Sequence, residues 1–445
     1  MNIIERIRVS IFPSSDTPSE TQQGPRRYFR SLLLHFRPRV IPERTLRFTL
    51  TWGLGGMATV LVFLLFGTGL LLKFVYEPFP DRAYDSILNL QQNIPFGQLI
   101  RNIHHFSGKF LLVIVFLHFL RVFFTGAFTR PRQFNWIIGL MLFGTIILSS
   151  YTGYLMPWDQ LAFWAITVSS SMLEYIPGIG NWLQKLLIGG KELGPQTLAN
   201  FYAIHTGILP TLLLLIMPFH FWRIRKANGL VIPRRPEEEI NTRGDKVETI
   251  PNLISREVTV ALALLAAVLL VAMLLDAPLA GKANPGLSPN PTKAPWYFMG
   301  FQELLMHFHP LFSVFIIPLL LILGLLSIPY INYQADTGGI WFCSARGRKM
   351  AVVCLVTAIT VTIIGVLIDE FMIGAANAGA NLISSLVPFV IVLAGCSGLY
   401  ALIKKRFGAT NNEAVQVLFV FLVTSFVVLT VIGIWFRGEG MKLVF

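Results

Sequence analysis

Long uncharged apolar runs are the feature that most limits what this chain can fold into. Eight runs are each about 20 residues long, enough to cross a bilayer as a helix, and they occupy residues 48–72, 134–158, 197–222, 258–275, 311–328, 350–368, 381–403 and 414–436. A ninth run, 101–125, carries charges around an apolar centre. Only 13% of the residues are charged, about half the fraction usual in soluble domains. The sequence therefore predicts an all-α integral membrane protein with nine transmembrane helices.

Positive charge is distributed unevenly between the two sides that nine crossings create. Of the 36 Lys and Arg residues, 26 fall in segments on the same side as the N-terminus. Because Lys and Arg are retained on the cytoplasmic side, this distribution predicts a cytoplasmic N-terminus. It also accounts for the net charge of +13 by contact with membrane lipid, with no nucleic acid as partner. We call the two faces the N-terminal side and the distal side.

Two changes in composition divide the chain into segments. The N-terminal residues are polar and rich in Arg, and a Pro-, Glu- and Arg-containing stretch near the middle is typical of a linker. The predicted organisation is a basic cytoplasmic arm (1–46), a four-helix unit (47–224), a cytoplasmic linker (225–255), two helices with a preceding loop (256–332) and three further helices (333–445).

Four histidines inside two of the predicted helices are the main functional signal, because ionisable or ligating residues within the membrane are costly. His104 and His118 are 14 residues apart, and His205 and His220 are 15 apart, so each pair falls on one helix face with roughly 21–22 Å between its members. Both helices run in the same direction, so His104 lies at the same depth as His205, and His118 lies at the same depth as His220. This frame fits two stacked iron porphyrins with two axial imidazoles each. His105 points away from that face, and the alternative for any single histidine is a hydrogen-bonded structural residue.

Glycines repeat with the same period in the two intervening helices. Gly55 and Gly69 are 14 residues apart, as are Gly139 and Gly153. A flat macrocycle needs close backbone approach, which glycine permits. Each glycine alone would fit ordinary small-residue helix packing, but the shared spacing favours a macrocycle site.

Two arginines lie one helical turn outside the histidines of the second predicted helix. Arg101 precedes His104 by three residues, and Arg121 follows His118 by three. Guanidinium groups at these positions can pair with heme propionates. The alternative is that their side chains extend to lipid headgroups.

The motifs around these residues resemble cytochrome b of the Rieske/cytochrome b complexes. The resemblance covers roughly residues 45–330 and rests on the segments 101–104, 118–121, 131–136, 153–160, 201–205 and 220–226. The spacing of the second histidine pair and the Pro-Trp-Asp-Gln motif at 157–160 are similar to those of the chloroplast and cyanobacterial branch, in which the protein is split into two chains. Here both parts are fused, as in the mitochondrial and proteobacterial branch.

The resemblance implies two b-type hemes and two quinone sites. His104 and His205 would ligate the heme of the distal, electrically positive side, and His118 and His220 the heme of the N-terminal side. Quinol (menaquinol or ubiquinol) would be oxidised on the distal side and quinone reduced on the N-terminal side. The residues implied are Tyr154, Pro157, Trp158, Trp296 and Tyr297 for the first site and Arg223, Arg225 and Lys226 for the second.

The sequence departs from the family at the loop that normally reads Pro-Glu-Trp-Tyr. Pro295 stands where the family has the Glu that accepts a quinol proton. Glu303, eight residues on, and Asp159 across the site are the candidates for this work, because a desolvated carboxylate with a raised pKa suits a proton acceptor. The alternative for Glu303 is an ordinary charge in a loop or at a helix end.

Other departures concern residues outside the four-helix unit. His307 and His309 are either a proton exit or surface residues, and Asp369 and Glu370 are expected to be surface charges rather than a proton path. Gly53 stands where the chloroplast branch carries a heme-attaching Cys, so a covalently bound third heme is not expected, and an unattached third heme stays an open alternative.

Partners follow from what the chain lacks. Its three cysteines form neither a Rieske signature nor a Cys-x-x-Cys-His heme site, so electrons are expected to leave to other subunits. The resemblance implies that these are a Rieske-type iron–sulfur protein and a c-type cytochrome subunit. The resemblance further implies a homodimer in a larger complex of the bacterial inner membrane, where bifurcated quinol oxidation drives proton translocation. The alternative is a non-bifurcating diheme conduit for a non-Rieske partner. A transporter would need paired charges or broken helices at midplane; the sequence indicates neither, and a transporter would leave the four histidines unexplained.

Overall fold

The protein is described by a computed structural model covering residues 3–11, 40–227, 229–234, 245–333, 337–373 and 382–444. Most of the predicted basic arm and the centre of the predicted linker lie outside these residues. Within them, nine helices are long and apolar enough to span a membrane, which confirms the predicted all-α membrane fold. They are Leu54–Lys73, Gly97–Phe124, Gln133–Leu155, Pro195–Lys226, Thr249–Leu274, Leu311–Tyr330, Ala345–Phe371, Leu386–Phe407 and Asn411–Trp435.

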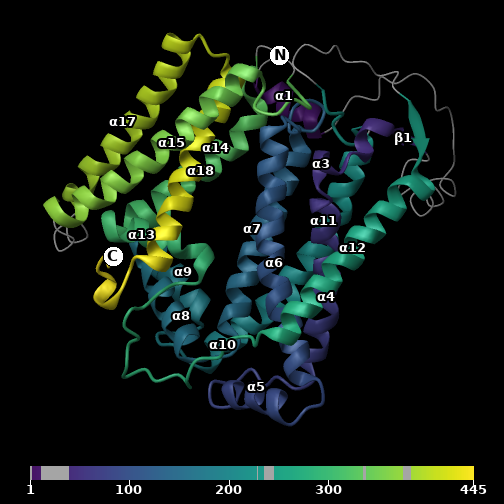
Figure 1. Ribbon diagram of the computed structural model, residues 1–445. Coiled ribbons are helices and arrows are strands. Elements are labelled where there is room, and N and C mark those ends of the chain that lie inside the picture. The colour runs from purple at the N-terminus through teal and green to yellow at the C-terminus, as the bar shows by residue number, and fades with distance from the viewer. Residues whose placement is uncertain are drawn as a thin grey trace.

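Four helices form the bundle that carries the histidines. These are α4 (Leu54–Lys73), α6 (Gly97–Phe124), α7 (Gln133–Leu155) and the continuous helix made of α10 (Pro195–Ala203), η3 (Ile204–Ile208) and α11 (Leu209–Lys226), and they stand side by side in Figure 1. Helix α12 (Thr249–Leu274) packs against α4 and α6.

The apolar core of this bundle lies between the two levels of histidine. Val62, Leu111, Ile146 and Leu213 are all buried in one cluster. Each of them sits at the midpoint of the glycine or histidine pair on its own helix. The pairs are therefore separated by close-packed hydrocarbon, which excludes water from the middle of the bundle.

The first predicted helix, 48–72, is wrong at its start. The backbone makes a short helix α3 (Phe48–Thr51), then turns at Trp52 and Gly53, which have φ values of 49° and 65°, before α4 begins. Two successive left-handed residues cannot continue a right-handed helix. A Cβ on Gly53 would lie 3.2 Å from Val260 of α12, so the glycine also permits the close approach of that helix.

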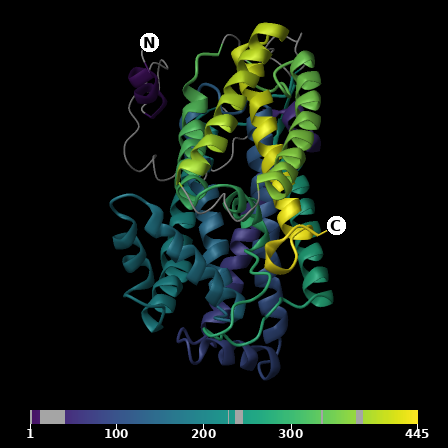
Figure 2. The same cartoon turned by 90° about the vertical axis from the view of Figure 1, so that its left-hand side faces the viewer.

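The C-terminal helices form a second group beside the bundle. Helix α15 (Ala345–Ile368) and helix α17 (Leu382–Phe407) pack against α18 (Asn411–Trp435), and α14 (Ile317–Ser327) lies nearby. The side view in Figure 2 shows α18 running along the same group and the C-terminus emerging near its end. Helix α13 (Met299–His307) packs directly on α18.

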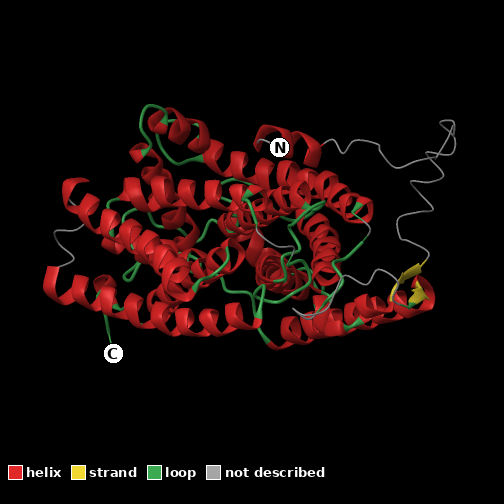
Figure 3. Ribbon diagram, turned by 90° about the horizontal axis from the view of Figure 1, so that it is seen from above, coloured by secondary structure: helices red, strands yellow, loops and turns green. Residues whose placement is uncertain are grey.

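The two sides of the molecule carry different small elements. On the N-terminal side, α1 (Ile3–Ile11) contacts α7, and the antiparallel strands β1 (Val40–Pro42) and β2 (Lys246–Glu248) join the arm to the linker, as the view from above shows (Figure 3). On the distal side are short helices: α5 (Ala83–Gln92), α8 (Gln160–Met172) and α9 (Gly180–Ile188).

Candidate functional site

The histidine pair nearer the distal side faces itself across the bundle. The ring centroids of His104 and His205 are 6.3 Å apart, and the rings are inclined at 79°. An atom bound to one nitrogen of each ring at about 2 Å would separate the centroids by roughly 6 Å. Within the described ranges no three His, Cys, Asp or Glu side chains gather into a metal-binding group. A metal held by this pair would therefore take its other ligands from a macrocycle such as a porphyrin.

A threonine fixes the orientation of each ring in this pair. Thr68 Oγ1 lies 2.9 Å from His104 Nδ1, and Thr152 Oγ1 lies 3.0 Å from His205 Nδ1. Each threonine immediately precedes the glycine that faces the same ring. The two bonds are equivalent, so the two rings are held in the same way.

The tautomer of both rings follows from the hydroxyl protons. Thr68 donates its single hydroxyl proton to the Leu64 carbonyl at 2.8 Å, and Thr152 donates to the Leu148 carbonyl at 2.9 Å. Each hydroxyl can therefore only accept from the imidazole, so Nδ1 carries the proton. This leaves the Nε2 lone pair of both rings free to bind a metal.

The second pair, His118 and His220, lies one apolar layer away toward the N-terminal side. Both rings are turned into the bundle against glycines of neighbouring helices. Among the described residues, His220 Nδ1 is buried without a hydrogen-bond partner. Like the first pair, the second pair therefore presents two imidazoles against glycines, the arrangement expected of a second macrocycle site.

Each predicted glycine lies against one predicted histidine. A Cβ would lie 2.7 Å from the His205 ring at Gly153, 3.2 Å from the His104 ring at Gly69, 3.5 Å from the His220 ring at Gly139 and 3.6 Å from the His118 ring at Gly55. The glycines thus make room for the imidazoles themselves, which the periodicity alone did not reveal. The distal pair is the more tightly enclosed of the two.

The unequal histidine spacings have a backbone cause. His205 lies within η3, a five-residue stretch of π-helix between α10 and α11. A π-bulge adds one residue to a helix, so 15 residues between His205 and His220 cover nearly the same rotation as the 14 between His104 and His118. The extra residue in the sequence was the signal for this bulge.

The two arginines next to the histidines differ in their free donors. Arg101 donates to the carbonyls of Ala277 and Pro278 at 2.6 and 2.7 Å. Arg121 donates from Nε to the Leu50 carbonyl at 2.9 Å, while its Nη2 is buried with no partner among the described residues. The orphaned Nη2 of Arg121 fits a propionate, whereas the terminal nitrogens of Arg101 are already engaged.

Aromatic side chains converge at the predicted quinol site on the distal side. Tyr151 of α7 packs edge-on against Phe298 at 5.6 Å, and Phe298 adjoins Tyr297 at 4.8 Å. The Tyr297 hydroxyl is buried without a partner in the described chain. Burial raises the pKa of Tyr297, and the neighbouring phenols of Tyr154 and Tyr151 raise it further. This phenol therefore stays protonated and can donate one hydrogen bond to a bound molecule.

The other residues predicted for the quinol site, Pro157, Trp158 and Trp296, border the aromatic cluster around Tyr297. Pro157 and the buried Trp158, whose φ is 48°, form the turn between α7 and α8, and Trp296 is partly exposed. A cavity of about 300 Å³ adjoins this turn on the distal side. Its lining includes Trp158, Phe163, Pro195, Lys282 and Pro285.

Asp159 has a structural position. Its carboxylate caps α8 by accepting from the Ala162 amide at 2.9 Å, and it accepts from the Ala280 amide at 2.9 Å. Both oxygens are therefore engaged with backbone amides, which hold α8 to the loop before α13.

Glu303 is not an ordinary helix-end charge, and its pKa is not raised. Its side chain is fully buried, with Arg437 Nη2 2.6 Å and His307 Nε2 3.2 Å from Oε1. Burial alone would raise the pKa of Glu303, but the hydrogen bonds from His307 and Arg437 and their charges outweigh it and lower the pKa. The expectation of a raised pKa is therefore wrong, because the contact with the distant Arg437 could not be predicted from the residues around Glu303.

His307, Asp369 and Glu370 join the same cluster. His307 Nδ1 lies 2.6 Å from Asp369 Oδ2, and Arg437 Nη1 lies 2.8 Å from Glu370 Oε2. The two carboxylates are thus paired rather than plain surface charges, and His307 is largely buried. His309 contacts Tyr175 edge-on at 5.3 Å.

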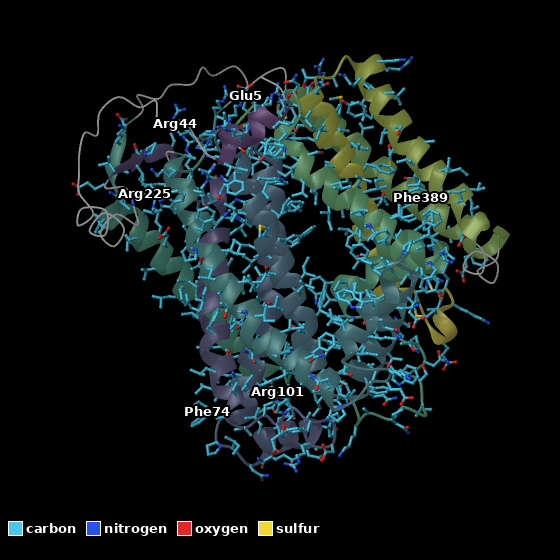
Figure 4. All side chains as sticks on the ribbon, turned by 180° about the vertical axis from the view of Figure 1, so that it is seen from behind. Glu5, Arg44, Phe74, Arg101, Arg225 and Phe389 are labelled. Carbon is cyan, nitrogen blue, oxygen red and sulfur yellow. The ribbon has the colours of Figure 1, made fainter. Side chains whose placement is uncertain are left out.

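On the N-terminal side, Arg223 holds α1 in place. Its guanidinium donates to the carbonyls of Ser10 and Ile11 and lies 5.1 Å above the Phe134 ring. Arg225 is half-buried, and Lys226 lies over the Trp222 ring at 5.6 Å. Figure 4 shows Arg225 toward the N-terminal side and Arg101 toward the distal side of the bundle.

The chain is similar to known proteins in sequence and in fold. The family described as "Cytochrome b(N-terminal)/b6/petB" matches residues 109–291. Cytochrome b6 of Prochlorococcus marinus strain NATL1A and that of strain MIT 9303 are each 39% identical over 173 residues, which cover 39% of this chain and 79% of the relative. A solved "Hyperthermophilic respiratory Complex III" chain is similar in fold, with a TM-score of 0.65 and 22% identity over 91% of this chain and 96% of that chain.

Proposed function

Because this chain belongs to the cytochrome b family of bc-type complexes, and so is a multi-pass membrane subunit of an oxidoreductase complex, we propose that it binds two b-type hemes. The observation that carries the proposal is the His104–His205 pair, with 6.3 Å between ring centroids. Both Nε2 atoms in that pair are freed by hydrogen bonds at Nδ1. His118 and His220 hold the second heme.

When bound, such hemes supply one-electron transfer along the bundle. The chain's own residues orient the imidazoles, exclude water between the two levels and neutralise propionate charge. Thr68 and Thr152 set the distal rings, and the buried Nη2 of Arg121 is the donor available to a propionate. Gly55, Gly69, Gly139 and Gly153 leave space for the rings.

On the distal side, quinol is oxidised between the end of α7 and the loop 295–298. Tyr297 offers a protonated hydroxyl inside an aromatic wall that includes Tyr154. Pro157, Trp158 and Trp296 border this wall. The substrate is menaquinol or ubiquinol.

On the N-terminal side, quinone is reduced near His220. Arg223 and Arg225 supply the positive charge there, with Arg223 already oriented by the end of α1. Oxidising quinol on one side and reducing quinone on the other moves protons across the membrane. The protein lies in the bacterial inner membrane with its N-terminus on the cytoplasmic side. Quinol oxidation on the distal side therefore releases protons outside the cytoplasm.

The electrons leave through other subunits of the complex, which are a Rieske-type iron–sulfur protein and a c-type cytochrome. The chain forms a homodimer within this complex.

A second candidate function is a non-bifurcating diheme conduit for a non-Rieske partner. Two observations favour it: Pro295 replaces the family's Glu, and Glu303 is held ionised by Arg437 rather than poised to accept a proton. Flash-induced electron bifurcation in the intact complex distinguishes the two.

The test of heme binding is a redox titration of the purified protein's visible spectrum with heme quantified against protein. We expect two b-type hemes of different midpoint potential per chain, and loss of one heme in each of His104→Leu and His205→Leu. His105→Leu is the matched control, because its ring packs on Phe106 at 5.2 Å rather than facing another imidazole. Folded parent protein with a heme ratio near zero would overturn the proposal.

A further inference from the structure

We propose that Arg437 and the tail that follows α18 position the quinol-site loop, which makes Arg437 a positioning residue for quinol binding. The inference rests on the proposed quinol oxidation at the distal side. It assigns a role to the C-terminal helices, which lie beyond the part of the chain that matches the family profile.

Arg437 is the centre of this arrangement. Its side chain is fully buried and binds three different segments. Nε and Nη2 bind the Glu303 carboxylate of α13, and Nη1 binds both Glu370 after α15 and the Met441 carbonyl of the tail, at 2.8 and 2.9 Å. A planar guanidinium carries five donors in a fixed fork, so it can bind a carboxylate with two bonds and still reach two other segments, a geometry that a lysine ammonium does not reproduce.

The tail also holds the loop directly. The Gly440 amide donates to Asn290 Oδ1 at 2.6 Å, and Lys293 Nζ donates to the Ile434 carbonyl at 2.8 Å. Both loop residues lie within five positions of Pro295. The last turn of α18 and the tail thus fix the approach to the loop from outside.

Helix α13 holds the same loop from inside. Gln302 accepts from the Ala294 amide at 2.7 Å and donates to the Thr292 carbonyl at 2.7 Å. Glu303 is the next residue of α13, so the group that Arg437 binds is adjacent to the group that fixes the loop. Movement of Glu303 therefore moves Gln302 and the loop with it.

Close packing transmits the position of α18 to α13. A Cβ on Gly300 would lie 2.7 Å from Phe426 and Thr430, and a Cβ on Gly433 would lie 2.8 Å from Met299. Met299 directly follows Phe298 of the loop. Helices α13 and α18 are closely packed at this point. The ionic contacts at Arg437 therefore act on two helices that move together.

The test compares Arg437→Lys with Arg346→Lys in the purified heme-containing protein. Arg346 pairs with Glu413 at 2.9 Å between α15 and α18, at the opposite end of the same helices. We expect Arg437→Lys to raise the KM for quinol at least about tenfold, as small misplacements in a binding site do, with heme content and both heme potentials unchanged. Arg346→Lys leaves the KM at the parent value.

Hydrogen–deuterium exchange of residues 289–298 supplies a readout that does not depend on quinol turnover. Exchange in this segment rises in Arg437→Lys and stays at the parent level in Arg346→Lys. If Arg437→Lys does not fold, Glu370→Gln takes its place in the test. This variant removes the Glu370 carboxylate from Arg437 and keeps the Glu303 pair, so we expect a smaller rise in exchange. Equal loop exchange in parent and all Arg437 and Glu370 variants, or an equal KM increase in Arg346→Lys, overturns the proposal. A parent without quinol-dependent heme reduction overturns the proposed function instead and leaves the exchange test valid.

Discussion

His205 Nδ1 donates to Thr152 Oγ1 at 3.0 Å, and Thr152 is committed to this role because its own proton goes to Leu148. The same arrangement holds for His104 and Thr68. The distal pair therefore has a defined tautomer, whereas the residues that precede Gly55 and Gly139, at the corresponding places beside the other pair, are the apolar Leu54 and Ile138. This asymmetry separates the two proposed heme sites chemically.

Replacing Thr152 by Val removes the acceptor that fixes the His205 ring. We expect weaker binding of the distal heme, by about 10- to 100-fold, as found when such outer hydrogen bonds to ligating histidines are removed. The heme of the N-terminal side keeps its potential. Heme retention and redox titration measure both effects. Thr59→Val is the matched control because Thr59, within the described chain, bonds the Gly55 carbonyl and no histidine. Unchanged distal heme in Thr152→Val would contradict the tautomer assignment.

The glycine distances predict a graded series of Ala variants. Gly153→Ala places a methyl 2.7 Å from His205, so the ring must shift, whereas Gly55→Ala places it at an ordinary contact of 3.6 Å from His118. We expect Gly153→Ala to lose the distal heme and Gly55→Ala to retain both, with Gly69→Ala intermediate. The heme-to-protein ratio of each purified variant measures this. The reverse order would show that the rings are held by something other than these contacts.

Periodicity was enough to predict the histidine frame. His104, His118, His205 and His220 lie on helices whose apolar runs are unambiguous, and facing residues follow from 3.6 residues per turn. The π-bulge at His205 was not predicted, because it depends on a local change of backbone hydrogen bonding. Trp52 and Gly53 were missed for a similar reason, since two left-handed residues interrupt a run that is apolar throughout.

The ionic cluster could not be predicted from local sequence. Glu303 and Arg437 are 134 positions apart, so their contact depends on how α13 packs on α18. Likewise, the binding of α1 by Arg223 joins residues more than 200 positions apart. Charged residues in loops next to membrane helices are common both as paired and as solvated groups. Only the three-dimensional arrangement distinguishes the two.

Glu303→Gln tests whether this carboxylate is structural. It leaves Arg437 buried without its main counter-charge, which costs about 3–5 kcal/mol for comparable buried pairs. We expect a lower unfolding temperature and faster hydrogen exchange in α13 and the C-terminal tail. Asp85→Asn, which breaks an exposed pair with Lys282, is the control and has little effect. A Glu303→Gln protein of parent stability that fails only in quinol oxidation would instead support a proton-accepting role.

Stability of the distal packing should fall at alkaline pH through His307. Burial lowers the pKa of His307, but the hydrogen bonds to Asp369 and Glu303 and their charges outweigh it and raise the pKa to about 9. The groups facing its ring are Glu303 on its own helix and Asp369 beyond α15, with Glu370 and Arg437 in the same cluster. Because the folded pKa exceeds the ordinary 6.5, the contribution is fully present below pH 6.5 and is lost as pH rises through about 9. It amounts to about 3 kcal/mol. Unfolding temperature measured from pH 6 to 10 should fall across this window in the parent and stay flatter in His307→Gln; parallel curves for the two proteins would show that His307 is not the group that titrates.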